Sequence, residues 1–388
     1  MKRVIVTDTQ YRMALAPMRE LAEKKYRVTA AEFSTVAPKA RLGFFSRDAA
    51  DTLTLGTDDE GFCAAVERAA GEDRPTLLCV NRKSMVLAMR SRERLERCVD
   101  LLLPSEEAMQ TADDKGRMYE VARRTGVPVP LTTALSAHES VEEMARAVRY
   151  PCIIKYRNGE ALGLKPAERY TVVRDEAAFI AAYTAMNEVD PDPIASDYIE
   201  GHDIGVAVVM DKRCRPVSAL CYESLHEYPL AGGPTCSLRT VWSPELVKMA
   251  CRLLEEIHFT GLAMLDFRGT VEQPYFLEIN PRVWGSAMIA PISASPLFER
   301  YVLAAQEAAQ PLDTERMRPE YHVGQKMRFT PQTFLCFAAL MKRGGRAETL
   351  GAYIKGFFDP AVCDGLFTLR DPKPYVHYLI NLLGRLNG

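Results

Sequence analysis

The sequence predicts a mixed α/β and α+β protein, with a small parallel-sheet domain first, two α+β units after it and a helical tail. Three observations support this expectation. Residues 3–30 follow the order strand, helix, strand, which opens a parallel sheet. Two short apolar runs, at residues 264–268 and 276–282, carry oxygen-bearing side chains at strand spacing. After about residue 310 the chain becomes basic and aromatic, and its apolar residues adopt helical spacing.

The length and charge of the chain limit its class. With 388 residues, 47% of them hydrophobic, it is long enough for two or three domains with their own cores. The net charge of -2 leaves no general basic surface, so no nucleic-acid partner is expected. The start holds only a short apolar run before Asp8, and no run approaches the roughly 18 apolar residues of a membrane span. We therefore expect neither a signal peptide nor a membrane anchor.

Ten cysteines are scattered along the chain without a C-x-x-C pair. Most stand inside apolar runs, as Cys79 and Cys152 do. This distribution is typical of buried, reduced thiols. It predicts a cytoplasmic location rather than disulfides or a zinc site.

The first domain is expected to contain a helix through residues 15–22 and strands at 3–7, 26–30, 76–80 and 101–103. The turn after the first strand reads Thr7-Asp8-Thr9, where a dinucleotide-binding domain would carry its glycine-rich fingerprint. We therefore do not expect this domain to bind NAD.

The middle of the chain alternates helices and strands. Helices are expected at 113–124, 138–149 and 244–258, and strands at 150–155, 196–199 and 204–210. The strand at 150–155 is apolar and ends on Lys155, so it places a cation at the end of a buried strand. Two further helices, at 332–342 and 374–386, are expected in the tail.

Three oxygen-bearing side chains form the most informative cluster. Asp266 follows one apolar run, while Glu278 and Asn280 lie two residues apart in the next, so the latter two point to the same strand face. Oxygen donors on neighbouring strands suit Mg²⁺, which completes its shell with water and phosphate oxygens. Arg282 stands just beyond and suits a phosphate. The alternative is the polar face of an ordinary surface hairpin.

Three loops carry weaker signals. Residues 157–163, after Lys155, hold two glycines and suit either a flap over phosphates or an ordinary hairpin turn. Residues 196–203 form a strand, a turn and a carboxylate, which suits adenine and ribose or a plain surface turn. Gly232 and Gly233 suit a loop that brings backbone N–H groups to an anion, or a simple connection.

In this order, these features resemble the ATP-grasp superfamily. The resemblance runs from about Asp113 to Pro296, and its most specific part is LEINPRVWGS, Leu277–Ser286. The run Gly261–Arg268 and the Gly-Gly-Pro-Thr loop are similar to a poorly characterised branch of predicted ATP-dependent carboxylate–amine ligases, or carboligases. The resemblance implies the ATP-grasp fold, in which two α+β subdomains clasp ATP.

The resemblance implies four parts. These are a Rossmann-like pre-ATP-grasp domain (1–104), a central subdomain with flap and hinge (105–200), a C-terminal subdomain with the metal site (201–315) and a helical extension (316–388). The proposed flap is the loop at 157–163, which would close over the reacting groups.

Roles for individual residues also follow from the resemblance. The nucleotide ATP would be held by Lys115 and Lys155 on the α- and β-phosphates, by Asp197, Tyr198 and Ile199 around adenine, and by Asp203 on the ribose. The metal Mg²⁺, for which Mn²⁺ is an accepted substitute, would be bound by Asp266, Glu278 and Asn280. Arg282 and Arg268 would have a catalytic role and stabilise the transferred phosphate. Gly232, Gly233 and Thr235 would contact the substrate carboxylate.

The implied activity is a ligase reaction that forms a C–N bond. ATP would phosphorylate a carboxylate to an acyl phosphate, and an amine would then displace the phosphate, leaving ADP and phosphate as products. The expected partners are small carboxylates and amines, amino acids or peptides above all. Two alternatives stay open: an acyl-phosphate enzyme like carbamoyl-phosphate synthetase, and a nucleotide-binding module without catalysis.

Three features outside the nucleotide site also carry expectations. His226 is expected to be structural rather than a base for the amine. The tail, residues 321–388, is expected to pack on the ligase domains rather than on an anionic lipid surface. Dimerisation is common in the superfamily, so the resemblance is compatible with a homodimer.

Overall fold

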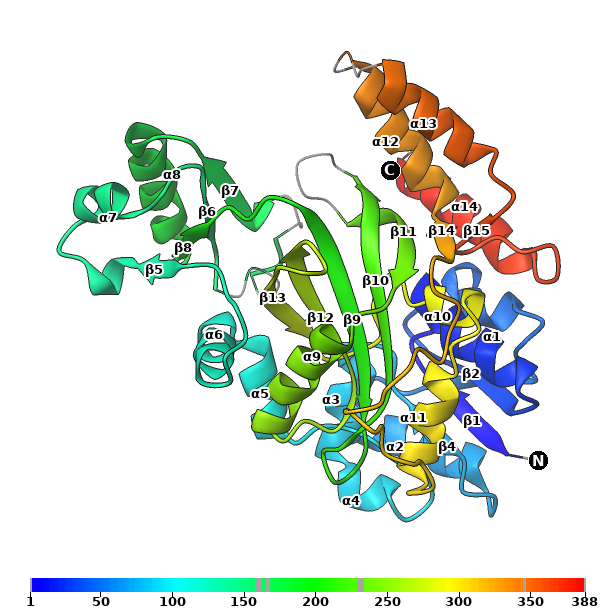
Figure 1. The fold of residues 1–388 in the computed structure, drawn as a ribbon. Helices are drawn as coiled ribbons and strands as arrows, with labels where there is room; N and C mark the ends of the chain where they lie inside the picture. Colours follow the sequence, from blue (N-terminus) through cyan, green and yellow to red (C-terminus); the bar gives the residue numbers. More distant parts are fainter. Residues whose placement is uncertain are drawn as a thin grey trace.

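The computed structural model describes residues 2–157, 159, 162–164, 168–228, 234–342, 344 and 347–386, and the structural statements below concern these residues. Three β-sheets organise the chain (Figure 1). The N-terminal part forms a four-stranded parallel sheet, the middle a four-stranded antiparallel sheet, and the remainder a seven-stranded sheet.

The N-terminal sheet has the strand order β3-β2-β1-β4. Its strands are β1 (Arg3–Val6), β2 (Arg27–Phe33), β3 (Asp51–Leu55) and β4 (Thr76–Leu78). Val4 and Val6 face one hydrophobic cluster and Ile5 faces another, as the two-residue period of a strand requires. The helices of this part are α1 (Leu15–Glu23), α2 (Asp59–Ala70), α3 (Arg82–Arg90) and α4 (Arg92–Leu95), with short 3-10 turns η1 (Arg12–Ala14), η2 (Pro38–Ala40) and η3 (Leu42–Phe45). The predicted opening of strand, helix and strand is confirmed.

The expectation of a strand at residues 101–103 is wrong. This apolar run is buried, but its carbonyl groups bond to side chains instead of a neighbouring strand: Leu102 O accepts from the Tyr301 hydroxyl at 2.7 Å, and Leu103 O accepts from Thr260 at 2.7 Å. Only Asp100 forms an isolated bridge, to Thr76 of β4. The fourth strand of the sheet is β3, at the opposite edge.

The small antiparallel sheet has the order β5-β8-β6-β7 and lies apart from the rest of the molecule, at the left of Figure 1. Its elements are β5 (Thr132–Ala134), η4 (Leu135–Ala137), α7 (Val141–Ala147), β6 (Cys152–Lys155), β7 (Tyr170–Val173), α8 (Glu176–Val189) and β8 (Ile194–Asp197). Phe179 and Tyr183 of α8 stack at 5.6 Å and pack against Ile154 of β6. Two helices, α5 (Glu106–Asp113) and α6 (Lys115–Arg124), connect this part to the first domain.

The seven-stranded sheet has the order β13-β12-β9-β10-β11-β14-β15. Its elements are β9 (His202–Met210), β10 (Pro216–Glu227), β11 (Thr235–Val241), α9 (Pro244–Glu256), β12 (Gly261–Gly269), β13 (Pro274–Asn280), α10 (Ile289–Ile292), α11 (Leu297–Ala305), β14 (Lys326–Arg328) and β15 (Val362–Asp364). Along β9, Val206 and Val208 face the cluster under α9, whereas Ala207 and Val209 face the cluster on the other side. Both faces of this sheet are therefore covered by apolar side chains along β9.

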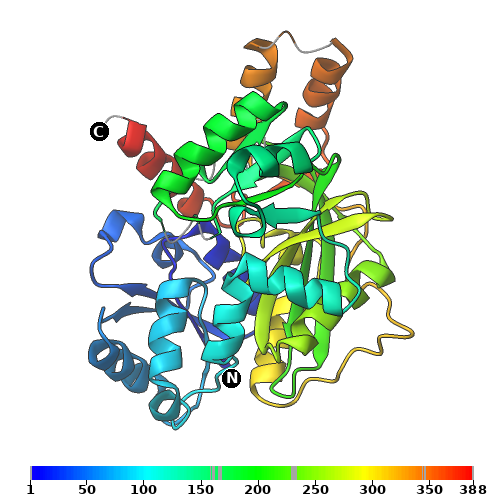
Figure 2. The same cartoon turned by 90° about the vertical axis from the view of Figure 1, so that its left-hand side faces the viewer.

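The N-terminal sheet and the seven-stranded sheet share one hydrophobic core. That cluster joins Val4 and Leu15 of the first domain to Ala207, Leu220 and Phe298 of the second. Figure 2 shows the two sheets on either side of the molecule, with the small sheet in front of and above them. Because the core is shared, the first domain is held against one face of the seven-stranded sheet.

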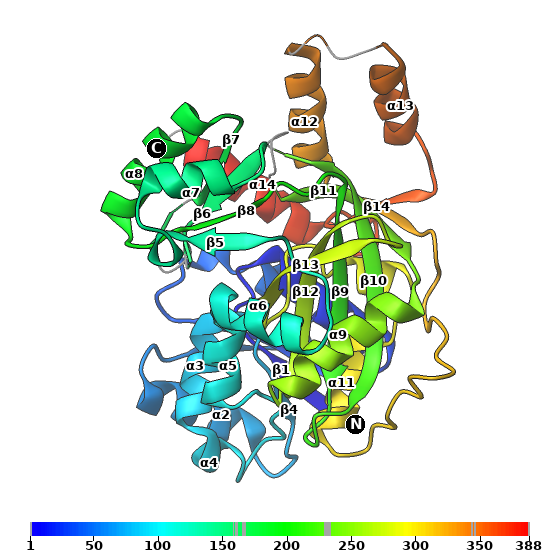
Figure 3. The same cartoon turned by 60° about the vertical axis from the view of Figure 1, so that its left-hand side comes forward.

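The C-terminal extension contains α12 (Thr330–Lys342), α13 (Ala347–Phe357) and α14 (Lys373–Leu386). Helices α12 and α13 form an antiparallel pair that projects from the body, whereas α14 lies against the N-terminal domain (Figures 1 and 3). Two three-residue strands, β14 and β15, join this extension to the seven-stranded sheet, and the sequence did not predict them. Within the described chain, no helix is long and apolar enough to cross a membrane. All ten cysteines are free thiols.

Candidate functional site

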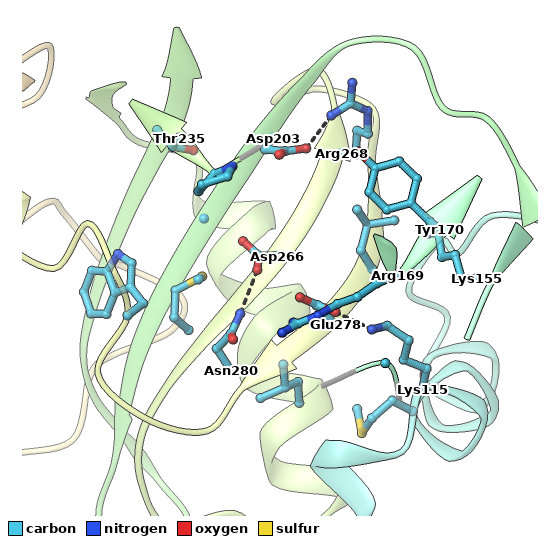
Figure 4. Close-up of a pocket in the computed structure, with 18 of the residues that line it drawn as sticks. Lys115, Lys155, Arg169, Tyr170, Asp203, Thr235, Asp266, Arg268, Glu278 and Asn280 are labelled. Carbon is cyan, nitrogen blue, oxygen red and sulfur yellow. Dashed lines mark hydrogen bonds and ion pairs between the residues drawn. The ribbon is translucent and has the colours of Figure 1, made fainter. Parts of the chain in front are cut away.

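A cavity of about 620 Å³ lies where the small sheet, the seven-stranded sheet and the N-terminal domain meet. This volume is typical of a small-molecule site. Ten of its lining side chains are labelled in Figure 4. The residues that the sequence singled out and that line this cavity are Lys115, Lys155, Asp197, Tyr198, Ile199, Asp203, Thr235, Asp266, Arg268, Glu278 and Asn280.

The three oxygen-bearing side chains come from two adjacent strands. Asp266 of β12 lies opposite Glu278 of β13, and Asn280 lies two residues further along β13. The amide Nδ2 of Asn280 donates to Asp266 Oδ2 at 2.8 Å. Leu265 and Ile279, which alternate with these residues, belong to the hydrophobic cluster on the opposite face of the sheet. The alternation of each strand thus directs its polar residues into the cavity.

Lys115, the first residue of α6, reaches this cluster from another element. Its Nζ lies 2.5 Å from Glu278 Oε2 (Figure 4). The Lys115 charge lowers the pKa of Glu278, and Glu278 in turn raises the pKa of Lys115. In the described part of the chain no cation forms an ion pair with Asp266, and its enclosure by the protein together with the Glu278 charge raises its pKa well above the usual value. The cations of the protein therefore neutralise Glu278 better than Asp266.

The donor set at this point fits Mg²⁺. Two carboxylates and one amide oxygen are hard donors, and Mg²⁺ commonly takes one or two carboxylates and completes its octahedron with water and phosphate. Asn280 donates a hydrogen bond from its Nδ2 to Asp266, so its Oδ1 is available to bind a metal ion. Among the described residues, no group of three or more His, Cys, Asp and Glu side chains is arranged to hold a metal. Two carboxylates and an amide oxygen suit an ion that completes its shell with other oxygen ligands.

Lys155 ends β6 and faces the same cavity. Burial, together with the nearby Lys115 charge, lowers the pKa of Lys155 to about 8. Its partner across the ladder is Tyr170 of β7, and Arg169 precedes that residue. Arg169 and Tyr170 also line the cavity, and sequence reasoning missed both. The sequence did contain a signal for Arg169, because this cation stands directly before the short apolar run at 170–173. Lys155 stands in a similar way at the end of the apolar run at 152–155.

Arg268 links the predicted ribose and adenine positions. Its NH1 lies 2.5 Å from Asp203 Oδ1, and its Nε donates to Ile199 O at 2.9 Å. Glu227 Oε1 lies 3.7 Å from the same NH1. Burial and the Asp203 charge raise the pKa of Glu227 to about 7. Arg268 therefore ties the segment after β8 to the start of β9, so it fixes the wall on which the nucleotide is expected to lie.

Gly232 and Gly233 fall outside the described residues, as does part of the loop at 157–163. Two described residues of that loop, Arg157 and Gly159, line the cavity, and Arg157 forms an ion pair with Asp192 at 2.7 Å. Arg282 is not part of the cavity wall, because its NH1 donates to the adjacent Val283 O at 3.1 Å, although its charge still acts on Asp266.

An aromatic wall of the cavity was also missed. Tyr222 of β10 lies across Gly205 of β9, where an added Cβ would overlap its ring. The ring stacks on Trp284 with 6.2 Å between centroids and an interplanar angle of 4°. Gly205 pairs with Asp266 on its other side, so Tyr222 borders the acidic cluster. Trp284 lies inside the motif that carried the resemblance, but nothing in a single sequence indicates that Tyr222 would meet it.

His226 has the structural environment that the sequence suggested. Its Nδ1 lies 2.6 Å from the Ser237 hydroxyl, and its ring packs against Tyr353 at 3.9 Å. Burial lowers the pKa of His226 to about 4. The imidazole is therefore neutral near pH 7.

Comparison with known proteins agrees with this geometry. Residues 112–286 match the model of the ATP-grasp domain family. Pyruvate carboxylase of Bacillus subtilis is 25% identical over 222 residues, which are 52% of this chain and 18% of that protein. D-alanine–D-alanine ligase of Stutzerimonas stutzeri is 25% identical over 182 residues, 45% of this chain and 56% of that protein. The matches thus span only part of these relatives.

One solved structure shows the likeness of the fold. The structure of biotin carboxylase from Campylobacter jejuni, described as a complex with β-γ-ATP, aligns with a TM-score of 0.64 and 17% sequence identity. The alignment covers 84% of this chain and 74% of that one. The family match covers the small sheet, β9 to β13 and the acidic cluster, all of which border the cavity. Residues 112–286 therefore match the ATP-grasp domain family, and the architecture of the chain is the ATP-grasp fold.

Proposed function

We propose that this protein is an Mg²⁺-dependent ligase that uses ATP to activate a carboxylate as an acyl phosphate and joins it to an amine. One observation carries the proposal: two lysines from separate elements, Lys115 and Lys155, line the same cavity as Asp266, Glu278 and Asn280. Cations beside hard oxygen donors suit a triphosphate with its metal ion.

In this proposal the lysines bind phosphate oxygens of ATP. Lys115 then exchanges its contact with Glu278 for a phosphate, and this exchange frees the Glu278 carboxylate for a cation. Bound Mg²⁺ would neutralise charge on the phosphoryl oxygens and lower the barrier to their transfer. The two carboxylates are already enclosed and held opposite each other, so little reorganisation is needed when the cation binds.

The substrate carboxylate is proposed to lie between the acidic cluster and the wall formed by Tyr222 and Trp284. There its oxygen would attack the terminal phosphorus of ATP, with ADP as the leaving group, to give an acyl phosphate. The amine would then attack the acyl carbon and expel phosphate, which makes the C–N bond. The loop at 157–163 remains the proposed flap that keeps water from the acyl phosphate.

Amino acids or peptides are the proposed substrate class. Support comes from the name of one relative, D-alanine–D-alanine ligase, and from the size of the cavity. Carbamoyl-phosphate-synthetase-like chemistry also passes through an acyl phosphate, but with another acceptor. The identity of the acceptor that stimulates ADP release would separate the two. A nucleotide-binding module without catalysis would release no ADP with any acceptor.

The test is substitution of Glu278 by Gln. We expect Glu278→Gln to abolish substrate-dependent ADP release, at least a hundredfold, because an amide cannot replace the charge at the metal position. ADP release should be measured with Mg²⁺-ATP across a panel of amino acids and small carboxylates. Circular dichroism and thermal denaturation show whether the variant remains folded.

Glu272→Gln is the matched control. Glu272 lies in the exposed turn between β12 and β13, on the same hairpin as Glu278 but away from the cavity. This control should keep full activity. A folded Glu278→Gln protein that releases ADP at the wild-type rate would refute the metal assignment, and a wild-type protein that releases none with any substrate pair would refute the ligase proposal.

A further inference from the structure

The N-terminal sheet has a point at which its strand order reverses. From β1 the chain proceeds outward to β2 and β3 on one side and then returns to β4 on the other side of β1. The loops that follow β1 and β4 therefore leave the sheet next to each other at its carboxyl edge. In open parallel sheets, ligands bind in the crevice outside the carboxyl ends of the strands at such a point.

These two loops open onto the cavity of the candidate site. Arg12, after β1, and Arg82, after β4, both line it. The loop after β1 is firmly held: Thr7 N donates to Leu78 O at 3.1 Å, and Asn81 N donates to the carboxylate of Asp8 at 3.1 Å. Asp8 itself turns the chain with a φ of 55°, a conformation that its hydrogen bonds must stabilise. Arg12 is thus presented from a rigid platform.

Arg12 is a partly enclosed cation without an acidic partner at contact distance. Arg82 forms an ion pair with Asp113 at 2.5 Å, but in the described part of the chain no carboxylate forms an ion pair with Arg12. Its guanidinium lies 3.6 Å from the centroid of the Phe329 ring. The charge of Asp364 acts on Arg12, but the oxygens of Asp364 already accept from Thr330 N at 3.1 Å and from the N–H groups of residues 366 and 367.

This arrangement suits recognition of a carboxylate. The Phe329 ring covers one face of the planar guanidinium and so fixes its orientation, and Tyr378 forms one hydrogen bond with the guanidinium. The remaining N–H groups of the fork can donate to a carboxylate. A lysine could not reproduce this fork. Arg12 and Arg82 line the cavity from the N-terminal domain, whereas Lys115 begins α6 and Lys155 ends β6. The cavity therefore receives cations from two different parts of the chain, and these form two cationic regions.

We propose that Arg12 binds a carboxylate group of the substrate that does not react, so that the substrate carries this group in addition to its reacting carboxylate or amine. An α-amino acid or a peptide with a free carboxylate has this chemistry. The lysine region would hold the phosphates of ATP, and the Tyr222 and Trp284 rings would contact the body of the substrate between the two regions. This inference rests on the proposed function, because it assigns the second cationic region of the same cavity.

The experiment compares wild-type protein with Arg12→Met and Arg12→Lys. The probes are the common amino acids in both enantiomers, each beside its α-carboxamide, with Mg²⁺ and a non-hydrolysable ATP analogue present. Binding is measured by thermal shift and by calorimetry. We expect at least one amino acid to bind at least tenfold more tightly than its amide to the wild-type protein, and both variants to lose this preference while the affinity for the ATP analogue is unchanged.

Arg41→Met is the matched control. Arg41 also packs on an aromatic ring, that of Phe44 at 5.4 Å, and it lies in the same domain but outside the cavity wall. This variant should bind as the wild type does. Equal binding of acids and amides by the wild-type protein, no binding of any amino acid, or an unchanged preference in folded Arg12→Met and Arg12→Lys would overturn the proposal. Failure of the ligase proposal would instead appear as an absence of ADP release while this binding preference persists.

Discussion

At the scale of single residues, the candidate site collects charges that oppose one another. Asp266 and Glu278 face each other across two strands, and Lys155 lies near Lys115. Burial and repulsion between like charges shift their pKa values: the pKa of Asp266 is raised, and the pKa of Lys155 is lowered to about 8. A site arranged in this way suits a ligand that supplies both a cation and anions, as the proposed metal-bound triphosphate does.

Removal of the Lys155 charge should stabilise the protein without ligand. In the unfolded chain the pKa of Lys155 is near 10.5, whereas in the folded protein it is about 8, so the folded state binds the proton less well. The resulting cost is fully present below about pH 8 and disappears as the pH rises toward 10.5. We expect Lys155→Met to raise the melting temperature by a few degrees at pH 7, and by much less at pH 9.5.

Thermal denaturation at the two pH values measures this effect. Lys83→Met, a cation on the N-terminal domain that lies 4.0 Å over the Phe33 ring, serves as control and should show no such pH-dependent gain. Lys155→Met should also bind ATP at least tenfold more weakly, because it lacks a phosphate contact. A gain in stability that is the same at both pH values would contradict the assigned cause.

The site residues that the sequence could predict are those whose signal is local. Glu278 and Asn280 lie two residues apart on one strand, and Lys155 ends an apolar run, so spacing alone gives their direction. Arg12 and Tyr222 were not predicted as site residues. They reach the cavity only because the first domain packs against the seven-stranded sheet and because Gly205 leaves room for a ring. Neither of these conditions can be read from a short stretch of sequence.

At the scale of elements, α1 and α11 are joined by one buried carboxylate. Glu20 of α1 accepts hydrogen bonds from the N–H groups of Phe298 and Glu299, at 2.9 and 2.8 Å, at the start of α11. Only 3% of its surface is exposed, and its second oxygen has no hydrogen-bond partner among the described residues. This contact links helices that are far apart in the sequence and lie between the two large sheets.

Glu20→Gln should stabilise the protein at alkaline pH. Burial raises the pKa of Glu20 from 4.5 to about 8, so the folded state binds a proton more tightly than the unfolded state does. The wild-type protein therefore loses stability as the pH rises from about 4.5 to 8. The amide keeps an acceptor for the two N–H groups and carries no charge, so its advantage should be large at pH 8.5 and small at pH 5.

Urea unfolding at the two pH values gives the free energies for this comparison. The matched control is Glu72→Gln, because Glu72 is exposed after α2. Its free energy of unfolding should follow that of the wild type at both pH values. The assigned cause would be wrong if Glu20→Gln were equally stable relative to wild type at pH 5 and at pH 8.5.

Elements were predicted best where they are long and regularly patterned. The helix at 244–258 and the strand at 204–210 are present with ends shifted by no more than two residues. The short strands β14 and β15 were missed, because three residues are too few to show a period. The run at 101–103 was wrongly expected to be a strand, because an apolar run indicates burial but not the partner of its backbone.

At the scale of the whole molecule, the C-terminal extension packs against the N-terminal domain. After the seven-stranded sheet, the chain returns along the N-terminal domain, where His377 of α14 stacks on Phe45 with 3.4 Å between ring centroids. Arg19 donates to Leu366 O at 2.9 Å. The tail was expected to pack on the ligase domains; α12 contacts β10 and β11 there, whereas α14 lies against the N-terminal domain instead. This packing also places α14 beside Arg12, because Tyr378 acts on that side chain.

Asp371 is the main polar anchor of this closure. It is 2% exposed, accepts from the Ser46 hydroxyl at 2.6 Å and from Arg47 N at 3.0 Å, and lies 3.8 Å from Arg19. Asp371→Ala leaves the Ser46 hydroxyl and Arg47 N without this acceptor and removes the ion-pair partner of the buried Arg19. Loss of one partner from such a buried network costs about 3 kcal/mol. We therefore expect Asp371→Ala to lower the free energy of unfolding by about this amount.

Hydrogen exchange distinguishes loss of the anchor from general destabilisation. In Asp371→Ala, amides in the C-terminal helix α14 and around residues 41–48 should exchange faster, whereas β9 in the shared core should change least. Asp359→Ala, a partly exposed acid of the same extension that lies 3.7 Å from Lys326, should leave both segments protected.

If α14 steadies Tyr378 against Arg12, Asp371→Ala should also weaken amino-acid binding while leaving the affinity for the ATP analogue intact. Uniformly faster exchange across all three sheets would instead show that Asp371 contributes to global stability without anchoring the extension.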